Sequence, residues 1–179
     1  MKNLKKLSTM AILTALSVVL VALVHFPIFP AVSFLEYDPA DIAILICGFA
    51  FGPGAGIAAT VAASLIQGLT VSAQSGVYGI IMHIIATTAL VLTSSLVYRK
   101  HKTKRGALIG IICGVLAMTA VMIPANLFIT PVFMGAPREA VVQLLPYIIL
   151  FNFIKAGVNG LVTFFIYKKV SGLIHNFNS

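Results

Sequence analysis

The chain has 179 residues, of which 60% are hydrophobic and only 9% are charged, and its mean hydropathy is +1.07. Soluble domains carry about 25% charged residues, and a fold of this size leaves much of its surface exposed. The composition therefore excludes a soluble nucleotide-binding domain, a disordered tail and a secreted disulfide scaffold. It predicts one integral membrane domain over residues 1–179.

Six apolar runs follow one another along the chain, each bounded by charged, proline or glycine residues. A helix needs about 20 residues to cross the hydrocarbon core of a bilayer. We predict spans at approximately 7–26, 42–51, 57–71, 77–98, 106–134 and 147–167, with loops at 27–41 and 135–146 and prolines 124 and 131 interrupting the fifth span. A re-entrant hairpin at 42–71 is the alternative for the two short runs.

The basic residues predict how this bundle is oriented in the membrane. Twelve basic and four acidic residues make a formal net charge of +8, and ten of the basic residues lie in segments 2–6, 99–105 and 168–169. Such segments keep the flanking loops in the cytoplasm. We therefore predict an all-α, six-transmembrane-helix bundle with both termini cytoplasmic and no binding to nucleic acid. Binding of segment 99–105 to nucleic acid or anionic lipid is the less favoured alternative.

Small residues recur on single faces of three spans. Ala11 and Ala15 share a face of the first span with Ser8 and Ala22, and glycines 106, 110 and 114 repeat every four residues on the fifth. Glycines 157 and 160 lie on the sixth span. Small residues allow close approach of helix backbones in lipid. Packing inside the bundle is the expected role, and docking of a separate membrane subunit is the alternative.

Lys155 is the one formal charge well inside a predicted span, eight residues from Tyr147 and about 12 Å along the helix axis. A lysine at that depth is costly in lipid, so it should face a cavity or a partner. Asn152 precedes it by three residues and Asn159 follows it by four, and all three side chains therefore project from one helical face.

Polar residues on other spans belong to the same half of the bundle. Asn126 lies on the fifth span, Gln67 on the third and His83 on the fourth. We expect Asn126 to converge with Asn152 and Lys155 toward the side of the acidic loops, with Gln67 and His83 bordering them. Hydrogen bonding between helices is the alternative role for these groups.

These amides and the single cation suit a polar small molecule that has an apolar face. The spans show no buried carboxylate pair, no Ser-His-Asp arrangement and no cluster of metal ligands, and the chain lacks G-x-x-x-x-G-K-[ST]. We expect a binding protein with no catalytic residue, no metal and no ATPase activity of its own. A lipid-acting enzyme with His83 or His25 as base and a self-sufficient channel or carrier are the alternatives from other classes.

Several motifs resemble the substrate-binding S components of energy-coupling factor (ECF) vitamin transporters, in particular the riboflavin-type branch. They are FLEYDPADI at 34–42, FGPGAG at 51–56, Asn126 with Pro131, and FNFIKAG at 151–157. Together they extend over most of the chain. The third span departs from that branch, because Gln67-Gly68 stands where riboflavin members usually carry Lys-Asn, and residues 76–83 look closer to the pantothenate-type members.

The resemblance implies an S-component fold in a bacterial plasma membrane, with a vitamin bound in the outer half as the transported ligand and no cofactor. It implies that Asn126, Asn152 and Lys155 hold the ligand, and its first-loop motif adds Tyr37 and Asp38. Ala11 and Ala15 match the face that docks on the transmembrane coupling subunit, which works with two ATPase subunits. Riboflavin is the expected ligand; pantothenate or another small water-soluble vitamin is the alternative.

Overall fold

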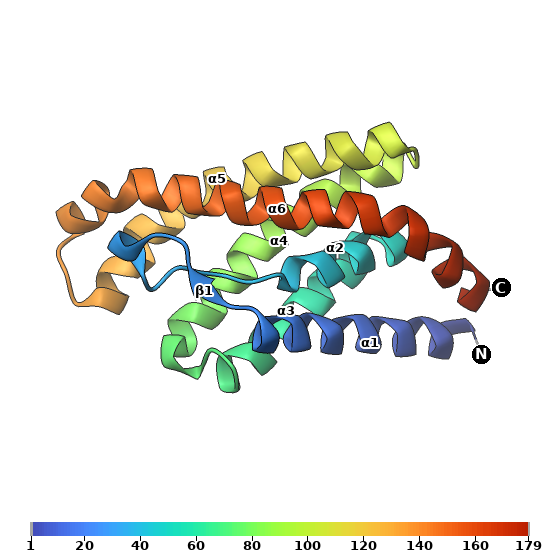
Figure 1. Ribbon diagram of the computed structural model, residues 1–179, viewed down its shortest axis with the longest axis horizontal. Coiled ribbons are helices and arrows are strands. Elements are labelled where there is room, and N and C mark those ends of the chain that lie inside the picture. Colours follow the sequence, from blue (N-terminus) through green and yellow to red (C-terminus); the bar gives the residue numbers. More distant parts are fainter. Residues whose placement is uncertain (1, 179) are drawn as a thin grey trace.

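The computed structural model describes the backbone of residues 2–178 and the side chains of residues 3–167 and 169. Helices make up nearly all of this range and lie side by side as a bundle (Figure 1). The elements are α1 (Lys2–Leu23), β1 (Phe26–Pro27), η1 (Pro30–Val32), β2 (Glu36–Tyr37), α2 (Ala40–Phe51), α3 (Pro53–Leu69), η2 (Ala73–Ser75), α4 (Gly76–Lys100), α5 (Lys104–Met134) and α6 (Arg138–Asn178). The start of α1 and the end of α6 lie at the same end of the bundle (Figure 1).

Four of the helices, α1, α4, α5 and α6, are long and apolar enough to cross a membrane by length and composition. Helices α2 and α3 are apolar but shorter, and the 12 residues of α2 extend over only about 18 Å. The membrane character of the chain thus has a structural basis. The count of six spans and the cytoplasmic side of the termini stay predictions.

Helix α2 lies at the centre of the bundle, where it packs against α1, α3, α4 and α6. Its side chains are buried on all sides, and Ile44 and Leu45 are completely inaccessible. This position explains why residues 42–51 form an unbroken apolar run without a polar face. The surrounding helices instead expose large apolar side chains outward, for example Leu23 and Phe165, as a surface in contact with lipid would.

The helices differ from the predicted spans in three places. Helix α1 ends at Leu23 because the following residues form β1, which pairs antiparallel with β2. Helix α5 continues through Pro124 and Pro131 without interruption. Helix α6 begins at Arg138, so most of the predicted loop 135–146 is helical. Helix α5 tolerates its prolines because each removes only one backbone donor, for which neighbouring helices in a membrane bundle compensate. Glu139, in the first turn of α6, favours a helix start at Arg138.

The segment between α1 and α2 folds back over one end of the bundle. Phe26 pairs with Tyr37 and Pro27 with Glu36, which makes this segment a narrow β-hairpin around η1 and departs from the purely α-helical prediction. Val32 of η1 is completely buried against Val141 and Ile148 of α6. This small second core fixes the segment beside the cavity described below.

Two glycines of α5 allow its close contact with α4. A Cβ atom at Gly110 would lie 2.7 Å from the carbonyl oxygen of Ser94, and one at Gly114 would lie 2.7 Å from that of Leu90. Packing inside the bundle is therefore confirmed for this part of the glycine repeat. We expect Gly110→Ala to lower the free energy of unfolding by about 1–3 kcal/mol, measured in mixed detergent micelles. Gly157→Ala is the control, because its Cβ would meet open space; an equal loss in both variants would contradict the packing role.

Candidate functional site

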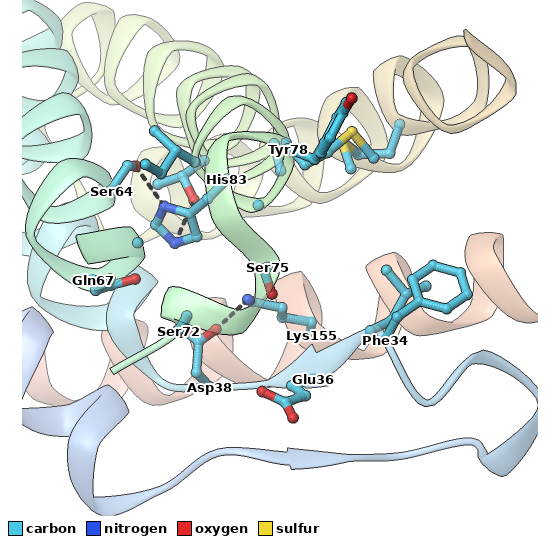
Figure 2. A pocket seen from close by; sticks show the side chains of 18 of the residues that line it. Phe34, Glu36, Asp38, Ser64, Gln67, Ser72, Ser75, Tyr78, His83 and Lys155 are labelled. Atoms are coloured by element: carbon cyan, nitrogen blue, oxygen red, sulfur yellow. Dashed lines mark hydrogen bonds and ion pairs between the residues drawn. The ribbon is translucent and has the colours of Figure 1, made fainter. Parts of the chain in front are cut away.

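A cavity of about 150 Å³ opens between α1, α3, α4, α5, α6 and the segment that contains β2. One water needs about 10–15 Å³ on the same measure, so the cavity has room for a small organic molecule. Aromatic and methionine side chains form much of its wall: Phe34, Tyr78, Met82, Met118, Met122, Phe133 and Phe151. Figure 2 shows Phe34 and Tyr78 at one side of the cavity and the polar residues at the other.

The structure brings six of the seven predicted ligand-binding residues to this cavity. They are Asp38, Gln67, His83, Asn126, Asn152 and Lys155. Tyr37 is not among the lining residues, because its hydroxyl turns to α6 and donates a hydrogen bond of 3.0 Å to Oδ1 of Asn159. Burial of this hydroxyl, followed by the nearby charge of Asp38, raises the pKa of Tyr37 above its ordinary value.

Lys155 has a counter-ion within the chain. Its Nζ lies 2.6 Å from Oδ2 of Asp38 (Figure 2), and the backbone N–H of Ala40 donates to Oδ1 of the same carboxylate at 3.1 Å. Burial alone would raise the pKa of Asp38, but the charge of Lys155 and its hydrogen bond outweigh that effect and hold the pKa below its ordinary value. The cavity therefore contains an ion pair, and Lys155, which was expected to face a cavity or a partner, has both.

A second carboxylate lies beside this pair. Asp41, in the first turn of α2, is completely buried. Asn159 donates to its Oδ2 at 3.0 Å and to the backbone oxygen of Asp38 at 2.9 Å, and Thr87 donates to its Oδ1 at 2.7 Å. No such pair was expected within the predicted spans, and these two buried acids instead belong to the predicted loop 27–41. Both acids flank the buried start of α2, where amide and hydroxyl donors from α6 and α4 replace water.

His83 connects α3 to α4. Its Nδ1 lies 2.7 Å from Oγ of Ser64, and its Nε2 lies 3.4 Å from Oγ1 of Thr87 (Figure 2 shows the histidine and the serine). Asp41 ends this series of hydrogen bonds, and it accepts from the hydroxyl of Thr87 and not from the imidazole. The arrangement therefore differs from a catalytic triad, in which the carboxylate accepts directly from the imidazole.

The three amides differ in how their donors are used. Asn126 and Asn152 each donate to a carbonyl oxygen one turn earlier, at 2.8 Å, and Oδ1 of Asn126 also accepts from Thr130 at 2.9 Å. Nε2 of Gln67 is buried and finds no hydrogen-bond partner among the described residues. Because Gln67 also lines the cavity, this N–H can donate to an acceptor bound there.

Glu36, Ser64, Thr87 and Thr130 also line the cavity and were not predicted as site residues. Hydroxyl residues in an apolar span are common, and the sequence gives no signal that separates these from hydroxyls elsewhere in the bundle. Glu36 belongs to the first-loop motif, but its place at the cavity depends on the hairpin that positions β2, which the sequence did not predict. The predicted docking residues lie apart from this site: Ala11 and Ala15 are exposed on the outer face of α1.

Comparisons with known proteins agree with this geometry. The family model described as "ECF transporter, substrate-specific component" matches residues 5–167. The solved structure of the S component of a bacterial ECF transporter is similar with a TM-score of 0.85 and 27% sequence identity, over 96% of this chain and 98% of that chain. A comparison with curated protein sequences found no match. The predicted family and S-component fold are confirmed, and the chain belongs to the substrate-specific components of ECF transporters.

Proposed function

We propose that this chain captures riboflavin at the outer side of the bacterial plasma membrane as the substrate-binding subunit of an ECF importer. The chain contains no phosphate-binding G-x-x-x-x-G-K-[ST] motif. As its membership of the S components implies, energy for transport is supplied by two ATPase subunits through a transmembrane coupling subunit. The first-loop and sixth-helix motifs, which resemble the riboflavin-type branch, support this ligand.

The charge of the cavity is the observation that carries riboflavin over pantothenate. Lys155 is paired with Asp38 at 2.6 Å, and Glu36 adds a second carboxylate to the lining. The cavity lining thus contains two carboxylates and one ammonium group, and Asp38 already neutralises that ammonium. A ligand carboxylate would have to displace Asp38 or remain unpaired in the cavity, and an unpaired charge is an effective means of rejecting a ligand. A neutral vitamin meets no such penalty.

The shape and chemistry of the walls also fit riboflavin. Its flat ring requires apolar and aromatic surface, which Phe34, Tyr78 and Phe151 provide. Its hydroxyl chain and ring carbonyls require several donors and acceptors in fixed positions. Asn152 and the unsatisfied donor of Gln67 offer such groups at the cavity wall.

Equilibrium binding to the purified chain tests the ligand. We expect riboflavin fluorescence to be quenched with a nanomolar-range Kd, and a large excess of pantothenate to leave the bound flavin in place. Displacement by pantothenate at comparable concentration would contradict the charge argument. Riboflavin flux into liposomes that contain this chain alone would contradict the subunit role and favour a self-sufficient carrier.

Gln67→Met tests the unsatisfied donor. The substitution keeps the length of the side chain but removes its N–H groups, so we expect riboflavin binding to weaken roughly two- to tenfold, the usual value of one hydrogen bond to a neutral acceptor. Thr88→Val is the matched control, because the Thr88 hydroxyl is also buried without a partner among the described residues but does not line the cavity. An equal effect in both variants would show that Gln67 acts on the fold and not on the ligand.

A further inference from the structure

The outer surface of the bundle carries a second hollow, between α5 and α6 and separate from the ligand cavity. Its volume is about 210 Å³, and its walls are entirely apolar. Leu108, Ile112 and Leu116 form the α5 side, and Phe153 and Leu161 border the α6 side. These five side chains are between 42% and 57% exposed, so the groove faces the surroundings of the bundle.

Gly157 forms the low floor of this groove. A Cβ atom built there would meet no atom within 4 Å, whereas the neighbouring Gly160 lies directly against Ile111. The groove therefore exists because one position of α6 lacks a side chain between two large ones, Phe153 and Leu161. A cylinder of hydrocarbon fits such a channel better than water does, since no polar side chain among the described residues lines it.

One end of the groove is strongly basic. Lys104 and Arg105, both exposed, lie in the first turn of α5. They precede Leu108 by four and three residues, so they project from the same helical face as the groove. The four acidic residues, Glu36, Asp38, Asp41 and Glu139, are remote from this end, because they belong to the β2–α2 region and the start of α6.

We propose that this groove binds one anionic phospholipid, with an acyl chain along α5 and α6 and the phosphate between Lys104 and Arg105. The groove extends about 12 Å along α5 from Leu108 to Leu116, which is close to the roughly 15 Å of one leaflet's hydrocarbon. Basic side chains at the end of a membrane helix reach the headgroup layer, and basic pockets between helices bind anionic headgroups there. The two basic side chains thus select the headgroup, and the groove holds the acyl chain.

Lipid titration followed by native mass spectrometry tests this site with the full chain. We expect phosphatidylglycerol to bind more tightly than zwitterionic phosphatidylcholine. Lys104→Gln with Arg105→Gln should weaken phosphatidylglycerol binding about 30-fold, the usual value of two basic residues at an anionic surface, and leave phosphatidylcholine unchanged. Gly157→Leu should weaken both lipids about tenfold, the equivalent of two acyl methylenes.

Two controls match these variants. Lys5→Gln with Lys6→Gln removes the same charge from exposed positions on α1, and Val158→Leu adds bulk at an exposed position of α6 outside the groove. Both should retain wild-type lipid binding. Equal affinity for the two lipids, or equal loss in a control and its partner variant, would overturn the proposal. Loss of uptake in Gly157→Leu with unchanged lipid binding would also overturn it and assign the groove to a helix of the coupling subunit.

Discussion

Replacing Lys155 with methionine is expected to lower the free energy of unfolding by about 3–5 kcal/mol and to weaken riboflavin binding more than tenfold. The substitution leaves the carboxylate of Asp38 buried without its cation, and removal of one partner from a buried ion pair has an effect of that size. The ligand also loses a hydrogen bond from the charged ammonium group, and this loss weakens its binding. Unfolding in mixed detergent micelles and riboflavin fluorescence quenching measure the two quantities separately.

The double variant Lys155→Met with Asp38→Asn separates the fold from the ligand. It contains neither charge, so we expect its stability to return to within about 1–2 kcal/mol of the wild type. Its riboflavin affinity should stay low, because the ammonium that faces the cavity is still missing. Affinity that recovers together with stability would mean that Lys155 only holds the hairpin segment in place. Unchanged affinity in the single variant would refute its place in the site.

Tryptophan at Ala11 is expected to abolish vitamin uptake while the purified chain keeps its riboflavin affinity. Ala11 and Ala15 are exposed on α1, on the outer face that also includes Ser8 and Ala22. Small residues there allow close contact with another membrane helix, and an indole would separate the two backbones. Uptake into cells that co-express the coupling and ATPase subunits measures the loss.

Ile109→Trp is the matched control for this coupling face. Ile109 is 54% exposed on α5 and does not line either hollow, so the added bulk should be accommodated by lipid and uptake should persist. Equal loss of binding and uptake in Ala11→Trp would refute the assignment of the docking face. Loss of uptake in both variants would show that outward bulk on any helix blocks transport.

The membrane class, the family and the helical segments could be predicted because each depends on local signals. Long apolar runs between basic segments indicate membrane helices directly. The end of α1 and the start of α6 could not be located in this way, because they depend on contacts between segments that are distant in the sequence. The hairpin pairs Phe26 with Tyr37, and the small core around Val32 lies against the outer part of α6, which is helical where a loop was expected.

The site could be predicted where depth in the membrane makes a polar residue costly, as at Lys155 and Asn152. The ion pair of Lys155 could not be predicted, since its partner Asp38 is 117 residues away in a segment expected to be a loop. Asp38 and Asp41 become buried only because α2 is surrounded by four other helices. That arrangement makes the cation one half of an internal ion pair as well as part of the cavity wall.

The visible absorbance spectrum of the protein, purified in detergent without added vitamin, tests the proposed ligand most directly. We predict a flavin band that remains with the protein through size-exclusion chromatography, at about one flavin per chain, and that is lost from Lys155→Met. A colourless wild-type protein from riboflavin-replete cells, with pantothenate released on denaturation, would contradict the account.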